Sequence, residues 1–453
     1  MHWRMLLKAC SIDRLLGRLV KCGKFRKIFV RIGIYRHYSP LVGGGFHYEM
    51  MALNALSEIA QQSADEFVCI TNPDEDIEWL ATQGGLPYRG HPIQTLSGRP
   101  EATQPLEAFL GNKPTAGREY DANQLLFDPF GARAVRKAGL DLIIQLSFHP
   151  FCFGSLKPFI VPIYDLNHRL HPEFPEVSAF GETNLRDYVF TNMCKYATFV
   201  LVDSEVGKSH VLRFYGDHID ADRIRILPYY PPFRRSGMPG AQELERVSTK
   251  YRLPPRYFFY PAQFWRHKNH ELIVRALRLI ADERAEDVRV VLCGNYADYF
   301  RALNIKRLSE LANELRVDDR VVYLGKVPDE DMPALYRLSC GLVMPTFFGP
   351  TNLPPLEAWH FGRPVITSNI PGIREQIGEA GLLVDPRSPQ ELARAMLRIW
   401  RDEALAAELA ERGKRRLAEY GWEDFVNRLA EIVTEACGRV REGRTPRYPE
   451  IAL

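Results

Sequence analysis

The feature that most constrains the fold of this 453-residue chain is a repeated alternation of short apolar runs with longer stretches of helical periodicity. Short, continuously apolar runs are typical of strands that are buried on both faces. Strands joined through helices run parallel, and helices then cover both faces of the sheet. The alternation therefore predicts an α/β protein built on parallel, doubly wound sheets.

The alternation falls into two series of similar length, and each series predicts one domain. The first series predicts strands at residues 27–35, 67–70, 140–146, 158–163, 198–202 and 224–227, with helices at 46–59, 131–138 and 206–215. The second predicts strands at residues 257–260, 288–293, 321–324 and 342–344, with helices at 269–281, 302–315 and 331–338. Residues 228–239, which read PYYPPFRRSGMP, break the pattern and are the predicted linker.

The remaining segments complete a three-part organisation. A polar, Pro- and Gly-containing segment from about residue 73 to 130 is interpreted as loops or an insertion, and residues 393–418 as one long helix. Residues 1–26 are predicted to form a basic amphipathic extension. Residues 27–235 are predicted to form an amino-terminal domain, which the last helix at about 420–440 completes, and residues 236–419 a carboxy-terminal domain.

Composition excludes several classes of protein. The chain is 46% hydrophobic and 25% charged, as expected of a soluble globular protein. Its net charge of +3 arises from 59 basic and 56 acidic residues, so the overall charge does not indicate a nucleic-acid partner. Eight scattered cysteines without a C-x-x-C pair favour buried thiols in a reducing, cytoplasmic compartment. The sequence shows no apolar run long enough to span a membrane.

Charge is uneven only at the amino terminus, where residues 1–31 hold nine Lys or Arg against the single acid Asp13. Apolar residues recur there at helical spacing, at Ile12, Leu15, Leu16, Leu19 and Val20. One interpretation is an interfacial helix that contacts anionic lipid at the inner membrane face. The alternative is a helix packed on its own domain, or a simple extension.

The strongest functional pattern is the segment 343–372, which reads VMPTFFGPTNLPPLEAWHFGRPVITSNIPG. An apolar strand, a loop, a short helix, a turn and a second strand follow one another. Such a loop–helix junction presents backbone N–H groups to an anionic ligand. Glu357 lies early in the helix, where its carboxylate can accept hydrogen bonds from a diol; alternatively, it only complements the helix dipole. The loop and helix start supply the candidate ligand contacts Gly349, Pro350, Thr351, Asn352 and Leu353.

Two further segments follow apolar strands and carry polar side chains. In YPAQFWRHKNH (260–270), Lys268 and Arg266 are candidate cations for a diphosphate, and Gln263 is a neutral donor. The alternative is a solvated basic turn.

In VPIYDLNHRLHPEFPE (161–176), Asp165 and His168 can orient an acceptor hydroxyl and take its proton. Capping a turn is the alternative role for Asp165, and a surface position for His168.

A glycine triplet after the first predicted strand is the last candidate. Glycines at a strand–helix junction let backbone N–H groups approach a ligand. The triplet gives a candidate loop for acceptor or phosphate contact, formed by Gly43, Gly44 and Gly45.

Together these segments resemble the family 4 glycosyltransferases, of the type called glycosyl transferases group 1. The resemblance lies in the Pro-Leu-x-Glu-Ala run that contains Glu357, in Lys268-Asn269, and in the Asp-Leu pair at 165–166. Three positions depart from the usual pattern. Gly349 stands in place of the first glutamate, Gln263 in place of the usual arginine, and Tyr164 in place of the usual histidine.

The resemblance implies the GT-B architecture, in which two Rossmann-like domains face a cleft that holds a nucleotide-sugar. It implies a retaining, metal-independent transferase without a cofactor, acting from a nucleotide diphosphate-sugar on a glycan or lipid-linked acceptor. Bacterial polysaccharide, O-antigen or capsule assembly is the implied setting. Two alternatives remain open: another GT-B enzyme such as an epimerase or phosphorylase, and a non-catalytic nucleotide-sugar-binding subunit.

Overall fold

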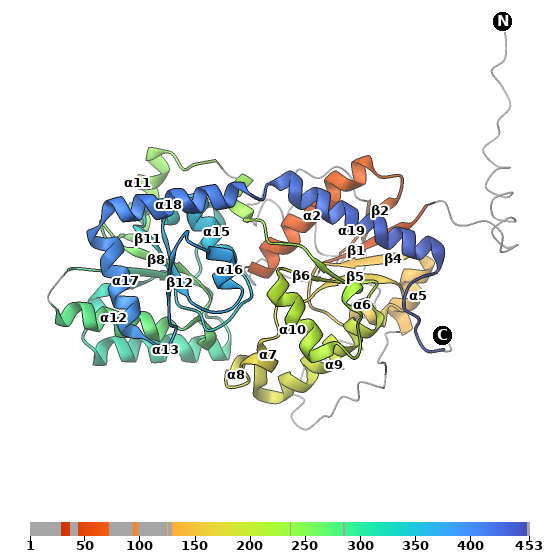
Figure 1. Ribbon diagram of the computed structural model, residues 1–453, viewed down its shortest axis with the longest axis horizontal. Helices are drawn as coiled ribbons and strands as arrows, with labels where there is room; N and C mark the ends of the chain where they lie inside the picture. Colours follow the sequence, from red (N-terminus) through yellow and green to blue (C-terminus); the bar gives the residue numbers. More distant parts are fainter. Residues whose placement is uncertain are drawn as a thin grey trace, which may run out of the picture.

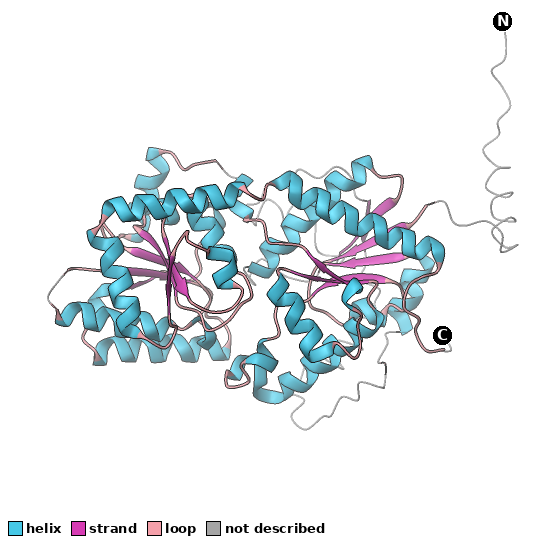
Figure 2. Cartoon of the chain, viewed as in Figure 1, coloured by secondary structure: helices cyan, strands magenta, loops and turns pink. Residues whose placement is uncertain are grey.

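The computed structural model describes residues 29–36, 44–71, 94–97, 125, 129–235, 237–283 and 286–450. Two α/β domains lie side by side, and helices cover both faces of each sheet (Figures 1 and 2). The predicted extension at 1–26 lies outside the described residues, as does most of the segment 73–130. The predicted α/β, doubly wound fold is confirmed.

The amino-terminal domain contains a seven-stranded parallel sheet in the order β3-β2-β1-β4-β5-β6-β7. Its strands are β1 (Arg31–Tyr35), β2 (Glu66–Thr71), β3 (Gln94–Ser97), β4 (Leu142–Gln145), β5 (Phe159–Pro162), β6 (Phe199–Val202) and β7 (Ile224–Ile226). Its helices are α2 (Gly44–Gln62), α5 (Pro129–Lys137), α6 (Phe151–Gly154), α7 (Asn167–Leu170), α8 (Pro175–Ser178), α9 (Glu182–Tyr196) and α10 (Glu205–Tyr215). The strand order reverses between β1 and β4, where doubly wound sheets bind ligands.

The carboxy-terminal domain contains a six-stranded parallel sheet in the order β10-β9-β8-β11-β12-β13. Its strands are β8 (Phe258–Pro261), β9 (Val290–Cys293), β10 (Val321–Tyr323), β11 (Gly341–Met344), β12 (Val365–Ser368) and β13 (Leu382–Val384). Its helices are α11 (Ala241–Tyr251), α12 (His270–Asp282), α13 (Tyr299–Glu314), α14 (Met332–Leu338), α15 (Leu353–His360), α16 (Ile373–Ile377), α17 (Pro389–Arg401) and α18 (Glu403–Ala418). Here the order reverses between β8 and β11.

The last helix, α19 (Trp422–Glu442), leaves the carboxy-terminal domain and packs on the amino-terminal one (Figure 1). Its buried apolar side chains share a core with Ile32 of β1 and with α2. The indole of Trp422 donates to the carboxylate of Glu58 on α2, at 2.9 and 3.1 Å. The amino-terminal domain is therefore completed by the end of the chain.

Several elements differ from the sequence-based predictions. β3 lies within a segment interpreted as loops, and neither α9 nor α11 was predicted. Residues 188–194 of α9 are all buried, so this helix lacks the one-sided apolar period that marks a surface helix. The helix predicted at 393–418 is two helices, α17 and α18, because the Asp402 side chain accepts from Leu405 N at 2.8 Å and starts a new helix.

Among the described residues, no helix is both long and apolar enough to cross a membrane. The described cysteines form no disulfide with one another and are buried or half-buried, at Cys69, Cys152, Cys194, Cys293, Cys340 and Cys437.

Close packing of α18 on α15 gives a test of the carboxy-terminal fold. A Cβ at Gly413 would overlap the buried indole of Trp359, whereas a Cβ at Gly438 of α19 meets nothing within 4 Å. We expect Gly413→Ala to destabilise the protein by about 1–3 kcal/mol through overpacking. We expect Gly438→Ala to stabilise it by about 0.5–1 kcal/mol, since alanine favours a helix. Denaturant unfolding measures both; equal effects would contradict this packing.

Candidate active site

The carboxyl ends of both sheets face a cleft of about 540 Å³ between the two domains. Segments that follow strands of both sheets line the cleft. From the amino-terminal domain these are the start of α2 and the segment after β5; from the carboxy-terminal domain they are the segments after β8, β9, β10 and β11. Two topological switch points therefore meet across one cavity, which is where α/β folds bind ligands.

The turn after β8 brings Lys268 into the cleft. Asn269 has a φ of 58°, a left-handed conformation that asparagine tolerates better than most residues. Its side-chain nitrogen donates to the carbonyls of Pro345 (2.8 Å) and Pro386 (2.7 Å). The Tyr260 hydroxyl donates to the Lys268 carbonyl at 3.0 Å. The turn is thus held rigidly from both sides.

Lys268 remains a cation at neutral pH despite its half-buried position. Burial lowers the pKa of its amine to about 8, and the nearby carboxylate of Asp165 opposes that shift. A partly dehydrated ammonium group binds an anion more strongly than a solvated one does. The structure places Lys268, the predicted anion ligand, in the cleft.

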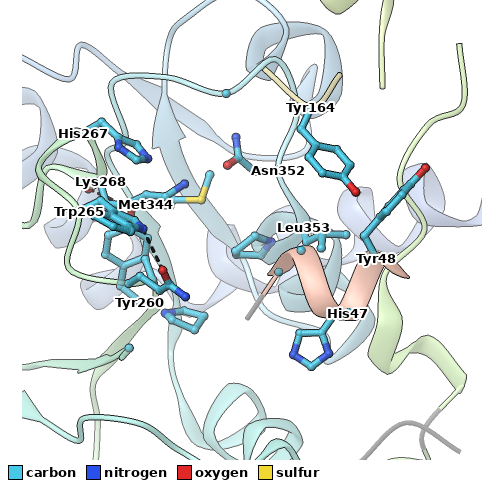
Figure 3. A pocket seen from close by; sticks show the side chains of 18 of the residues that line it. His47, Tyr48, Tyr164, Tyr260, Trp265, His267, Lys268, Met344, Asn352 and Leu353 are labelled. Carbon is cyan, nitrogen blue, oxygen red and sulfur yellow. Dashed lines mark hydrogen bonds between the residues drawn. The ribbon is translucent and has the colours of Figure 1, made fainter. Parts of the chain in front are cut away.

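The two neighbouring candidates behave differently. Gln263 lines the cleft, and its side-chain oxygen accepts from the Trp265 indole at 2.8 Å (Figure 3). Arg266 is exposed and does not line the cleft, so the structure does not bring this predicted second cation to the site. Lys326, which follows β10, lines the cleft instead; sequence reasoning missed it, because no motif surrounds it.

The loop after β11 explains the glycine at position 349. Gly349 has a φ of 127°, and an added Cβ would lie 2.7 Å from the side-chain nitrogen (Nδ2) of Asn352. The backbone of Asn352 is fixed by Gln376, which accepts from Asn352 N at 3.0 Å and donates to Asn352 O at 2.7 Å. The Asn352 side-chain nitrogen is buried, lines the cleft with its residue, and has no hydrogen-bond partner among the described residues.

Thr351 lines the cleft, but its hydroxyl is already engaged across it. The hydroxyl donates to the carboxylate of Asp203, which follows β6 in the amino-terminal domain. Burial raises the pKa of Asp203 to about 6, against the hydrogen bonds from Thr351 and Ser204. In this arrangement the hydroxyl of Thr351 joins the domains, and Asn352 is the loop side chain left to contact a ligand.

Glu357 lies in α15 with its carboxylate buried at the cleft. The Tyr336 hydroxyl donates to it at 2.5 Å, and burial raises the pKa of the carboxyl to about 6. Pro354 and Pro355 have no backbone N–H, so the first turn of α15 offers an anion fewer donors than an ordinary helix start. Cationic side chains must consequently provide more of any phosphate binding.

His47 of α2 is a cleft residue that sequence reasoning missed. Its Nε2 lies 3.4 Å from Oδ1 of Asp329, in the other domain. Burial lowers the pKa of His47, but the carboxylates of Asp329 and Glu357 outweigh it and the net shift is upward. Gly44 and Gly45 also line the cleft, and Gly43 lies outside the described residues. The glycine triplet predicts a ligand-binding loop at this position, but no sequence motif marks His47 itself.

The acceptor-side candidates separate into one cleft residue and one core residue. Asp165 lines the cleft, and its Oδ1 accepts from Asn167 N at 3.1 Å. His168 is 1% exposed, with Nε2 at 3.0 Å from Asp187 and 3.1 Å from the Tyr215 hydroxyl. The structure therefore places His168 in the domain interior, away from the cleft, contrary to the role predicted for it.

Tyr164 stands in the cleft where the resemblance implies a histidine. Its hydroxyl donates to the carbonyl of Leu146, and its ring packs edge-on against Tyr48 (Figure 3). The hydroxyl is thus held by the backbone immediately after the neighbouring strand β4. Across the described part of the chain, no group of three His, Cys, Asp or Glu side chains is placed to hold a metal ion.

Residues 241–416 match the family described as Glycosyl transferases group 1. O-antigen chain mannosyltransferase B of Escherichia coli is 28% identical over 232 residues, which are 50% of this chain and 58% of that protein. The D-inositol 3-phosphate glycosyltransferase of Salinispora arenicola is 32% identical over 237 residues, 49% of this chain and 52% of that protein. The matches thus span little more than half of these curated relatives.

Solved structures match nearly the whole chain. Anabaena Alr3699/HepE in complex with UDP and glucose gives a TM-score of 0.66 at 16% identity, covering 90% of this chain and 100% of that one. WaaG, a glycosyltransferase involved in lipopolysaccharide biosynthesis, gives 0.60 at 14% identity, covering 89% and 99%. The two sheets and their cleft define a GT-B protein. The similarity to the group 1 glycosyltransferase family lies within its carboxy-terminal domain.

The loop geometry predicts how the Gly349 departure responds to mutation. We expect Gly349→Glu to destabilise the loop, because a side chain at a φ of 127° is strained and meets Asn352. Asn352→Ala should leave the fold intact and weaken nucleotide-sugar binding about twofold to tenfold, the value of one neutral hydrogen bond. Calorimetry with UDP-glucose and with UDP separates the two effects. Equal weakening of both ligands would show that Asn352 does not contact the sugar.

Proposed function

We propose that the protein is a retaining glycosyltransferase, which moves a sugar from a nucleotide diphosphate-sugar to an acceptor hydroxyl. The observation that carries the proposal is the convergence of Lys268, Asn352 and Glu357 on one side of the interdomain cleft. A half-buried cation, an unpaired amide and a buried carboxylate suit a diphosphate, a sugar hydroxyl and a ribose diol respectively.

In the proposed reaction, the bond between the anomeric carbon and the phosphate oxygen breaks while the acceptor oxygen bonds to the same face of the sugar. The acceptor proton passes to the departing phosphate oxygen. Lys268 stabilises the negative charge that grows on the diphosphate. Asp165, on the opposite wall of the cleft, orients the acceptor hydroxyl. None of these steps uses a metal or a cofactor, so we expect activity to persist in EDTA.

The acceptor is proposed to be a growing glycan or a lipid-linked sugar in bacterial polysaccharide assembly. Two comparisons support this choice: the relative named O-antigen chain mannosyltransferase B, and WaaG, which is involved in lipopolysaccharide biosynthesis. Peripheral contact of the basic extension with anionic lipid at the inner membrane face, and a cytoplasmic location, are part of the same proposal.

A panel of nucleotides and nucleotide-sugars tests the function directly. A ligand that binds only the folded state raises the melting temperature. We expect a shift with one nucleoside diphosphate and its sugar conjugate, for example UDP with UDP-glucose or GDP with GDP-mannose. We also expect slow hydrolysis of that donor without acceptor. Binding without hydrolysis or transfer to any glycan would favour the non-catalytic alternative.

Lys268 gives the pH dependence of donor binding. The pKa of its amine is lowered to about 8, so the cation is fully present below that pH and is lost as the pH rises through it. We expect nucleoside diphosphate affinity to fall between about pH 7 and 9 in the wild-type protein. Lys268→Met should remove this dependence and cost about 2–4 kcal/mol in transition-state stabilisation.

The matched control is Arg266→Met, which changes an exposed cation on the same turn and should alter neither quantity. Equal, small effects of the two substitutions on calorimetric affinity and on kcat/KM would identify the turn as a solvated basic run.

A further inference from the structure

The amino-terminal domain contributes a second carboxylate to the cleft beside Asp165. Glu176 lies in α8, lines the cleft, and has a side chain that is only 3% exposed. Its Oε1 accepts from the backbone N–H of His267 at 3.0 Å and lies 2.9 Å from the ring Nδ1 of that residue. These contacts cross from the amino-terminal domain to the turn that carries Lys268.

The other oxygen of this carboxylate has no such partner. Oε2 of Glu176 is buried and accepts no hydrogen bond from the described residues. A tie between the domains needs only one oxygen, and Oε1 already provides it. Leaving a buried carboxylate oxygen unpaired is costly, so a site of this kind is expected to gain a donor when its ligand binds.

The surroundings fix the charge and direction of the carboxylate. Burial raises the pKa of Glu176, but the hydrogen bonds from His267 outweigh it and the net shift is downward, so the group is an acceptor only. Burial lowers the pKa of His267 to about 4, so its ring is neutral and its Nδ1–H is the donor to Glu176.

Aromatic rings and backbone contacts hold His267 in place. Its carbonyl accepts from Phe347 N at 2.8 Å, and its ring packs against Phe348 and Phe174, with centroids 5.1 and 6.2 Å apart. Such packing keeps the dielectric around Glu176 low, which strengthens any hydrogen bond it accepts. Glu176 is therefore preorganised and does not have to move to bind a ligand.

From this geometry we infer that Glu176 is a specificity-determining residue whose Oε2 accepts a hydrogen bond from a sugar hydroxyl bound in the cleft. The inference rests on the proposed function. It adds that Glu176, a side chain of the amino-terminal domain, recognises the sugar. The hydroxyl belongs either to the donor sugar beside Lys268 or to the acceptor sugar beside Asp165. Glu176 and Asp165 both line the amino-terminal side of the cleft, so both sources lie within reach of the same wall.

The test uses the full-length protein with Glu176→Gln, which keeps the shape but turns the second acceptor into a donor. The matched control is Glu173→Gln, which removes an exposed carboxylate of the same segment that pairs only with His171 among described residues. The probes are UDP, UDP-glucose, GDP and GDP-mannose in calorimetry, and methyl α-mannoside as acceptor. If Glu176→Gln lowers the melting temperature by more than a few degrees, Glu176→Asp, which keeps the charge, replaces it.

If Oε2 contacts a hydroxyl of the donor sugar, we expect the Glu176→Gln protein to bind the nucleoside diphosphate normally but to lose about tenfold to a hundredfold in affinity for its sugar conjugate. If Oε2 contacts a hydroxyl of the acceptor sugar, we expect both affinities and the rate of donor hydrolysis to stay unchanged, while KM for methyl α-mannoside rises by a similar factor. Either result supports the inference, provided that Glu173→Gln behaves as wild type. Unchanged sugar affinity and KM, or equal loss of diphosphate and conjugate, would overturn it and leave Glu176 as a tie between domains. A wild-type protein that binds none of the probes would overturn the proposed function and this inference together, and that outcome is visible without any variant.

Discussion

The alignment of strands in two parallel sheets is the constraint on which the rest of this structure depends. Parallel strands all end at the same edge of a sheet, so every loop that follows a strand in one domain emerges toward the other domain. Polar groups that cannot be paired within either core therefore collect in one cleft. The depressed pKa of Lys268 and the raised pKa values of Asp203 and Glu357 all follow from this shared, partly dehydrated space.

Three polar contacts cross the cleft, and each ends on an element that faces the ligand space. Asp203 holds the loop at Thr351, Glu176 holds the turn at His267, and His47 lies beside Asp329. The amino-terminal domain is consequently more than an acceptor platform, because its side chains set the positions of the loops proposed to bind the donor. An alteration in one domain can thus change binding attributed to the other.

Much of the fold could be predicted from sequence, because buried parallel strands leave continuous apolar runs such as those of β4 and β11. The positions after those strands, Lys268 and Glu357 among them, were predicted to face one site for the same reason. Tertiary contacts that leave no local pattern could not be predicted. The burial of His168 depends on Asp187 and Tyr215, which are distant in sequence, and the occupation of Thr351 depends on a residue 148 positions away. His47, Lys326 and Glu176 were missed because no motif marks them.

The position of α19 on the amino-terminal domain means that the polypeptide passes between the domains at two separate places, once after β7 and once after α18. Two domains joined by a single chain segment can rotate relative to each other about any axis. Two domains joined by two segments rotate most freely about the line through the two connections. We therefore expect any opening of the cleft to be mainly a rotation about the line that joins the two crossings. The order of the chain, rather than any particular contact, thus confines the path along which the two walls of the cleft can separate and return.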